Sequence, residues 1–176
     1  EYLYVNPLAS KPFLDSTVVL ANRLNHKEFI ARTTNYSGVY HNMTSQYQKA
    51  DSIFDVVIKM YTELNDMEQV SYALNNKALA LNSMGRFKEC LEVHMKSLKL
   101  KEGIGDTEES IAASYWNIGN IHGDIGNYDI SNEYYNKAKA VFEKLNLKDD
   151  LASVNVNLAL NLKNQKSYEE SKSLLF

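Results

Sequence analysis

The segment SYWNIGNIHGDIGNYDISNEYYNKA, residues 114–138, contains the pattern that decides the fold. Apolar residues before position 126 recur at intervals of three and four, the spacing of one face of an α-helix; they are Tyr115, Ile118, Ile121 and Ile125. Gly126-Asn127 interrupts this pattern, and glycine at such a point favours a helix end. A second helical stripe follows, formed by Tyr128, Ser131, Tyr135 and Ala138. The segment therefore predicts two helices joined by a tight turn.

The same arrangement recurs along the chain every 40 or 41 residues. An aromatic residue begins each predicted second helix, at Tyr47, Phe87, Tyr128 and Tyr168. A small residue lies three positions after it, at Ala50, Cys90, Ser131 and Ser171, and another lies nine positions before it, at Gly38, Ala78, Gly119 and Ala159. We interpret the second set as points where a larger side chain would hold two helices apart. A phosphate-binding loop is not indicated, because it needs a preceding strand and usually a following lysine.

Helix starts repeat as well and set the expected boundaries. Three capping boxes are indicated, Asn25 with Glu28, Asp66 with Gln69 and Asp106 with Glu109. Asp149 is expected to cap the last unit, and Asn6-Pro7 to open the first helix. These starts predict one all-α domain over residues 1–176 with about nine helices. Its expected parts are the second helix of a partial unit at 1–24, complete units at 25–65, 66–106 and 107–147, and a unit truncated at its C-terminus at 148–176.

Composition excludes several kinds of function. The net charge is −3 and no basic stripe is present, so no nucleic acid contact is expected. No apolar run approaches the ~20 residues of a membrane span, so no membrane contact by this region is expected. The single cysteine, Cys90, cannot form an internal disulfide, and the four histidines are interpreted as structural, so no metal or other cofactor is expected. The chain reads as an excerpt of a longer protein, and its compartment, cytoplasm or periplasm, stays open.

The unit at 107–147 closely resembles the tetratricopeptide repeat (TPR). The matching positions are Tyr115, Ile118, Gly119, His122, Gly126, Tyr128, Ser131, Tyr135 and Ala138, with His122 in place of tyrosine and Ser131 in place of alanine as mild departures. Lys77 and Ser37 stand where the family has an aliphatic residue, so the two preceding units resemble it less. The period also exceeds the ~34 residues usual for the family. Longer units of this kind resemble those in cargo adaptors, in peptide-sensing bacterial regulators, and in the sensor regions of Bacteroidetes histidine kinases and LuxR-like regulators. The stretch YVNPLASKPFLDSTVVLANRLN, with its high content of asparagine and tyrosine, is most similar to the last group. The resemblance implies a right-handed α-α superhelix of TPR hairpins.

In TPR proteins the first helix of each unit lines a concave groove, and the resemblance implies which residues would do so here. The expected groove residues are Asn35, Tyr36, Asn75, Asn76, Leu79, Ser83, Trp116, Asn117, Asn120, Asp124, Asn157, Leu160 and Asn164. Asn76, Asn117 and Asn157 share one register position, and an amide side chain both donates and accepts hydrogen bonds. Such amides suit the backbone of a bound extended peptide, or alternatively hydrogen-bond between adjacent helices and stabilise their stacking. A carboxylate clamp is not favoured, because Arg32 and Lys163 are the only basic groove candidates.

These features predict a non-catalytic protein-binding or peptide-binding module, the sensory or interaction region of a larger bacterial signalling protein. No catalytic residue is expected in this chain. Two alternatives remain open: a scaffold that self-associates into a homo-oligomer, and the dimerisation region of a sensor histidine kinase whose catalytic parts lie elsewhere.

Overall fold

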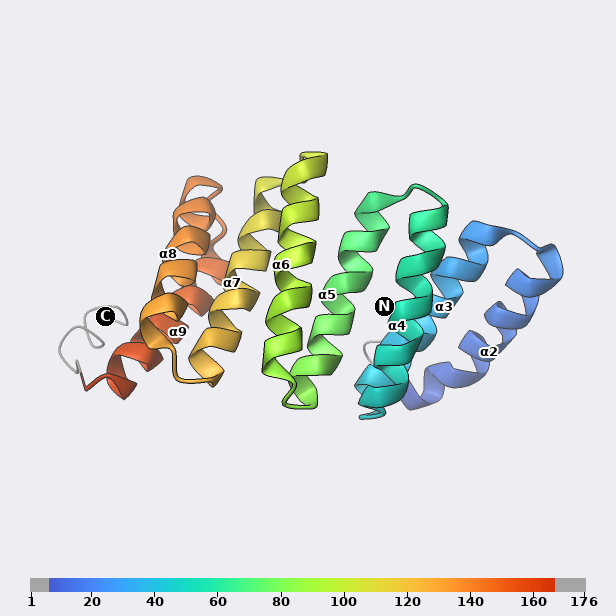
Figure 1. The fold of residues 1–176 in the computed structure, drawn as a ribbon, viewed down its shortest axis with the longest axis horizontal. Helices are drawn as coiled ribbons and strands as arrows, with labels where there is room; N and C mark the ends of the chain where they lie inside the picture. Colours follow the sequence, from blue (N-terminus) through green and yellow to red (C-terminus); the bar gives the residue numbers. More distant parts are fainter. Residues whose placement is uncertain (1–6, 167–176) are drawn as a thin grey trace. The chain divides into compact units, whose positions relative to one another are not determined.

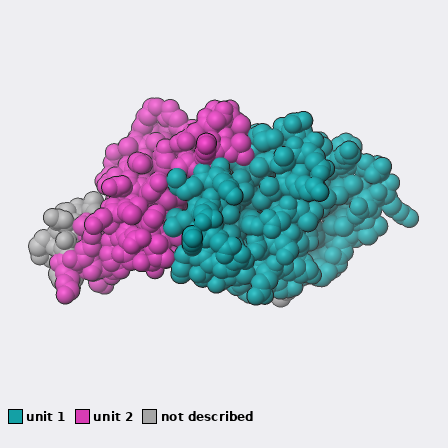
Figure 2. All heavy atoms as spheres, viewed as in Figure 1, with its two compact units in different colours: residues 1–97 teal, residues 98–176 magenta. Residues whose placement is uncertain are grey.

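The computed structural model describes residues 7–166, and these residues form eight helices and no strand. The helices are α2 (Pro7–Leu24), α3 (Lys27–Met43), α4 (Tyr47–Glu63), α5 (Met67–Ser83), α6 (Phe87–Ile104), α7 (Glu108–Asp124), α8 (Tyr128–Lys144) and α9 (Lys148–Asn164) (Figure 1). The chain divides into two compact units, residues 1–97 and 98–176, with the division inside α6 (Figure 2).

The first unit is organised around the hairpin of α3 and α4. Helix α2 packs against α3, and α5 packs against α4 (Figure 1). The inward face of α4 is fully buried through Phe54, Val57 and Tyr61. Two side chains of α6 bond to carbonyls of α5, Cys90 Sγ to Ala78 O at 3.2 Å and Ser97 Oγ to Ser71 O at 2.9 Å. Neighbouring helices of this unit are therefore joined by apolar packing and by buried hydrogen bonds.

The second unit contains the hairpin of α7 and α8, with α9 packed against α8 (Figure 1). Its core consists of Ala112, Tyr135, Ala138, Phe142, Val154 and Leu158. Ser131 Oγ of α8 donates to Gly119 O of α7 at 2.7 Å, the same register pair as Cys90 with Ala78 in the first unit. The two units thus repeat one hairpin geometry.

The small residues nine positions before each aromatic lie where two helices meet. A Cβ atom on Gly38 would lie 2.6 Å from a ring carbon of Phe54, and one on Gly119 would lie 2.7 Å from the ring of Tyr135. Both distances are too short for real Cβ contacts. The middle unit has Ala78 at this position, and its register partner is the smaller ring of His94. The prediction of a close-contact column is confirmed at Gly38 and Gly119.

Each of the eight described helices is followed, directly or after one residue, by a residue with positive φ. Glycine or asparagine occupies six of these positions, because they adopt the left-handed conformation at low cost; the full set is Asn25, Ser45, Asn65, Gly85, Gly105, Gly126, Asn146 and Lys166. Gly126 therefore ends α7 as predicted.

Three of the expected caps need correction. Asn25 ends α2 with φ 49°, so it is His26 whose ring nitrogen accepts from Phe29 N to cap α3. Thr107, not Asp106, caps α7 through a bond from Ser110 N. Helix α9 begins after Leu147, which places Asp149 in its first turn.

Of the two remaining cap predictions, one is confirmed and the other concerns a residue outside the described part of the chain. Asp66 Oδ1 accepts from Gln69 N at 3.1 Å, as expected for the cap of α5. Pro7 begins α2, and Asn6 lies outside the described residues.

The all-α prediction is confirmed. The ninth expected helix, which would begin at Tyr168, lies outside the described residues. Within residues 7–166 no helix has the length and apolar content needed to cross a bilayer.

Candidate peptide-binding site

The expected groove residues of the first unit include two exposed apolar side chains. Tyr36 on α3 is 44% exposed and Leu79 on α5 is 43% exposed. Asn76, one turn before Leu79, is half-buried, and none of the described residues forms a hydrogen bond with its amide. Ser83 Oγ donates to Leu79 O of its own helix, and Asn75 is half-buried. The face of α5 that carries Leu79 and Asn76 therefore offers both apolar and amide contacts to solvent.

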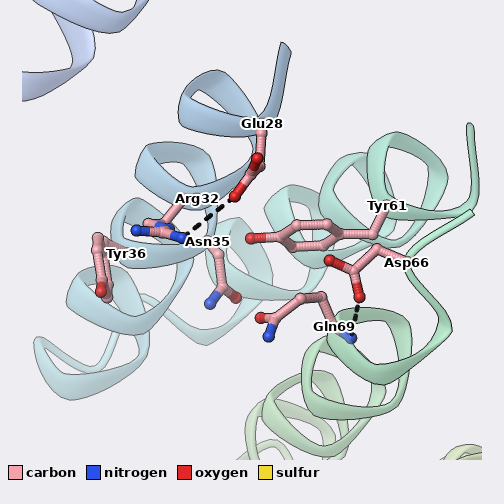
Figure 3. Close-up of a pocket in the computed structure, with 7 residues that line it drawn as sticks. All are labelled: Glu28, Arg32, Asn35, Tyr36, Tyr61, Asp66 and Gln69. Atoms are coloured by element: carbon pink, nitrogen blue, oxygen red, sulfur yellow. Dashed lines mark hydrogen bonds and ion pairs between the residues drawn. The ribbon is translucent and has the colours of Figure 1, made fainter. Parts of the chain in front are cut away.

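A pocket of about 270 Å³ lies in the same unit between α3, α4 and α5 (Figure 3). Two of its residues, Asn35 and Tyr36, belong to the expected groove, and Tyr61 of α4 also lines it. Sequence analysis named Arg32 only as a basic groove candidate, and it did not place Glu28, Asp66 or Gln69 in a binding site. The helical spacing of Glu28, Arg32 and Asn35, which places them on one face of α3, was the only sequence feature that could have indicated this part of the pocket.

Charge in this pocket is partly neutralised. Arg32 Nη2 lies 3.3 Å from Glu28 Oε1, one helical turn away. Asp66 uses Oδ1 to cap α5. Tyr61 is only 2% exposed, and its burial raises the pKa of its phenol, although nearby Arg32 opposes the shift. Its hydroxyl points toward Asn35 of α3 (Figure 3).

Asn35 leaves a polar atom unsatisfied. Its Oδ1 is buried and forms no hydrogen bond with any described residue. A buried acceptor without a donor costs about 1–3 kcal/mol, so such an atom usually finds water or a ligand. The equivalent position of the second unit is Trp116, and its Nε1 is likewise buried without a hydrogen-bond partner among residues 7–166.

In the second unit two expected groove residues bond to each other. Asn157 Nδ2 of α9 donates to Asn120 Oδ1 of α7 at 3.0 Å, and Tyr135 OH of α8 donates to the same oxygen at 2.7 Å. This geometry corresponds to the helix-stacking alternative for Asn157. Asn120 Nδ2 and Asn157 Oδ1 take part in no hydrogen bond within the described part of the chain, so a donor and an acceptor remain for other contacts.

A second polar network was missed from the sequence. Asn161 Nδ2 donates to Ser131 Oγ and to Asn132 Oδ1, both at 2.8 Å, although Asn161 is only 5% exposed. Gly123 makes room for it, because a Cβ there would lie 3.3 Å from Asn161 Oδ1. Asn157, Asn161 and Gln165 follow one another at intervals of four residues, and this helical spacing of three amides could have indicated the network from the sequence.

The other expected groove residues of the second unit differ in how far they are buried. Trp116 packs against the core of this unit and is only partly buried. Leu160 is 51% exposed, and Val156, one turn earlier, is 46% exposed. Asn117 is half-buried, whereas Asp124 and Asn164 are exposed.

Comparison with known proteins adds sequence and structural relatives. Residues 69–144 match the model of the tetratricopeptide repeat. Tetratricopeptide repeat protein 29 of Homo sapiens is 25% identical over 125 residues, which are 71% of this chain and 25% of the human protein. The chain thus spans a quarter of that relative's length.

Two solved structures are also similar. One is a Signal Transduction ATPase with Numerous Domains (STAND) protein with a tetratricopeptide repeat sensor from Pyrococcus horikoshii, with a TM-score of 0.83 at 14% identity over 97% of this chain and 27% of that one. The other is a Rap protein complexed with competence and sporulation factor, with a TM-score of 0.73 at 16% identity over 97% of this chain and 50% of that one. At these identities the likeness shows the fold alone.

Proposed function

We propose that this chain, whose residues 69–144 match the tetratricopeptide repeat, is a non-catalytic interaction scaffold that binds a protein or peptide segment on the exposed faces of its first helices. The observation that carries the proposal is the exposure of apolar side chains at the expected groove positions in both units. Tyr36 and Leu79 are exposed in the first unit, and Leu160 in the second. Single exposed apolar residues are ordinary, but Leu79 and Leu160 are exposed at the same register position of two repeats, and this shared position supports a common use.

Amides beside these apolar residues supply the polar half of the contact. Asn76 has no hydrogen-bond partner in the described structure, and Asn120 and Asn157 each keep one free donor or acceptor. A peptide backbone presents alternating N–H and C=O groups. A carboxamide side chain can donate a hydrogen bond to such a C=O group and accept one from such an N–H group. Leucine side chains would then contact the bound side chains and supply most of the affinity.

We propose further that the bound segment acts as a signal. The resemblance to bacterial sensor regions supports this role, and the solved STAND protein carries a tetratricopeptide repeat sensor. The boundaries of a single domain over residues 1–176, with units beginning near 25, 66, 107 and 148, are part of the same proposal.

Selection of peptides from a random display library tests the binding proposal. Selected peptides are titrated into the protein while the fluorescence of Trp116, the chain's single tryptophan, is recorded. We expect Leu79→Ala and Leu160→Ala to raise Kd at least about fivefold, the effect of losing roughly 1 kcal/mol. Val56→Ala is the matched control, because Val56 is 48% exposed on α4, outside the expected groove.

Two results would contradict the proposal. One is a selection in which no peptide of the library binds. The other is an equal loss of affinity in Val56→Ala and Leu79→Ala. Size-exclusion chromatography with light scattering addresses the self-association alternative, which requires a mass that grows with protein concentration.

A further inference from the structure

The pocket between α3, α4 and α5 presents three polar groups without partners among the described residues. Asn35 Oδ1 is buried and unpaired. The Tyr61 hydroxyl has no hydrogen-bond partner within residues 7–166, although its side chain is almost completely buried. Asp66 caps α5 with Oδ1, and its Oδ2 forms no hydrogen bond with any residue that the structure describes. Two of these groups only accept hydrogen bonds, and a phenol oxygen can accept as well.

The charge of the pocket favours a cation. Glu28 and Asp66 carry negative charge, and Arg32 carries the one positive charge among the lining residues. Arg32 is already paired with Glu28 at 3.3 Å. Asp66 forms no ion pair within residues 7–166, so its charge is the one left to attract a ligand.

The walls of the pocket suit an alkyl chain that ends in a positive charge. The ring of Tyr61 lies between α3 and α5 with its hydroxyl directed toward Asn35, and Asp66 lies beside the ring (Figure 3). Tyr36 adds a second ring, which is partly exposed, at the other side of the pocket. Aromatic faces attract cations and also pack against methylene groups.

We infer that this pocket takes the ammonium group of a lysine side chain supplied by the bound segment, an inference that rests on the proposed function. The ammonium has three N–H donors, and the pocket offers Asn35 Oδ1, the Asp66 carboxylate and the Tyr61 oxygen. The charge-assisted bond to Asp66 is the strongest of these contacts.

An NMR titration with small probes tests the inference directly. Nα-acetyl-lysine N-methylamide should shift the side-chain amide signals of Asn35 and Gln69, whereas Nα-acetyl-norleucine N-methylamide, which has an alkyl chain but no charge, should leave them unchanged. Absence of shifts up to the solubility limit of the lysine probe would overturn the inference. Equal shifts with the norleucine probe, or larger shifts with Nα-acetyl-glutamate N-methylamide, would also overturn it.

Substitutions separate a cation site from an anion site. Asp66→Asn keeps a good cap for α5 but removes the charge, so lysine affinity should fall about tenfold, the loss of one charge-assisted bond. Tyr61→Phe should weaken binding less, because the ring remains. Arg32→Gln should strengthen lysine binding, because it removes the competing positive charge. A loss of binding in Arg32→Gln would indicate an anion site and overturn the inference.

Glu92→Gln is the matched control, since it removes an exposed carboxylate from α6 of the same unit, outside the pocket. The lysine probe should bind this variant as it binds the wild type. An affinity loss equal to that of Asp66→Asn would mean that only overall charge matters, which contradicts a defined site.

The selected peptides distinguish failure of the inference from failure of the proposed function. If peptides bind but show no preference for lysine and tolerate Asp66→Asn, only the inference fails. If no peptide binds, the proposed function fails. Enrichment of lysine at one peptide position, with loss of binding in Asp66→Asn, supports both.

Discussion

The side-chain amide of Asn157 donates a hydrogen bond of 3.0 Å to Asn120 Oδ1, joining α9 to α7 inside the second unit. We predict that this bond stabilises the fold by about 0.5–1.5 kcal/mol, the usual net value for an intramolecular hydrogen bond. Denaturant unfolding of Asn120→Ala, Asn157→Ala and the double variant measures it as the coupling energy. Strictly additive effects of the two single changes would show that the pair contributes nothing.

The same bond affects how peptide capture should be tested. Asn157→Ala is expected to lower stability and affinity together, so its effect on binding cannot be assigned to the ligand alone. Asn76 has no hydrogen-bond partner in the described structure. Asn76→Ala should therefore change peptide affinity while leaving the free energy of unfolding within about 0.5 kcal/mol of the wild type.

Gly119→Ala should destabilise the second unit. The added Cβ would lie 2.7 Å from two ring carbons of Tyr135, and that ring is held by the 2.7 Å bond from its hydroxyl to Asn120. Overpacking of this kind costs about 1–3 kcal/mol. Gly103→Ala is the control, because a methyl group added to Gly103 of α6 would meet no neighbouring atom within 4 Å. Gly103→Ala should stabilise the helix by about 0.5–1 kcal/mol. A similar loss of stability in Gly119→Ala and Gly103→Ala would contradict the packing argument.

Acid should destabilise the protein through His122. Burial lowers the pKa of this imidazole below its ordinary value of 6.5, so the unfolded chain binds the proton more readily than the folded one. Stability contributed by neutral His122 is therefore lost as the pH falls from about 6.5 through the folded pKa. His122→Leu, which introduces the residue found at the equivalent position Leu81, should flatten this dependence in unfolding curves recorded between neutral and mildly acidic pH. Unchanged pH dependence would rule out His122 as its source.

Repeat reasoning predicted the hairpins because their determinants are local and recur. The interval between Gly119 and Tyr128 is the same as that between Gly38 and Tyr47, and each glycine faces a ring of the following helix. Helix starts were predicted less well. At Asn25 an oxygen-bearing side chain fits both an N-cap and a left-handed helix end, and only the three-dimensional path of the chain decides between them.

The pocket could not be read from the sequence for a different reason. Its residues come from three helices, and Tyr61 belongs to a second helix, which the family pattern does not assign to the groove. Asp66 had a sufficient local explanation as the cap of α5. Likewise Asn161 lies at the contact of α9 with α8, where its partners Ser131 and Asn132 are about thirty residues earlier in the chain.

Lys77 departs from the aliphatic pattern of the family, and α4 compensates with two carboxylates. Lys77 Nζ lies 3.0 Å from Asp51 Oδ1 and also pairs with Asp55, while Arg86 Nη1 lies 2.8 Å from Asp51 Oδ2. Burial alone would lower the pKa of Lys77, but the hydrogen bonds to Asp55 and Asp51 outweigh it and raise this pKa.

Asp51→Ala should therefore destabilise the first unit by about 1–3 kcal/mol, because it leaves the largely buried Lys77 with one partner fewer. Lys77→Leu should cost less or even stabilise, since it restores the aliphatic residue and Asp51 keeps Arg86 as its partner. Thermal and denaturant unfolding of the two variants measures this order, and in the Lys77→Leu background Asp51→Ala should cost less than in the wild type. A larger loss for Lys77→Leu than for Asp51→Ala would show that the lysine is itself the stabilising element rather than a buried charge that Asp51 makes tolerable.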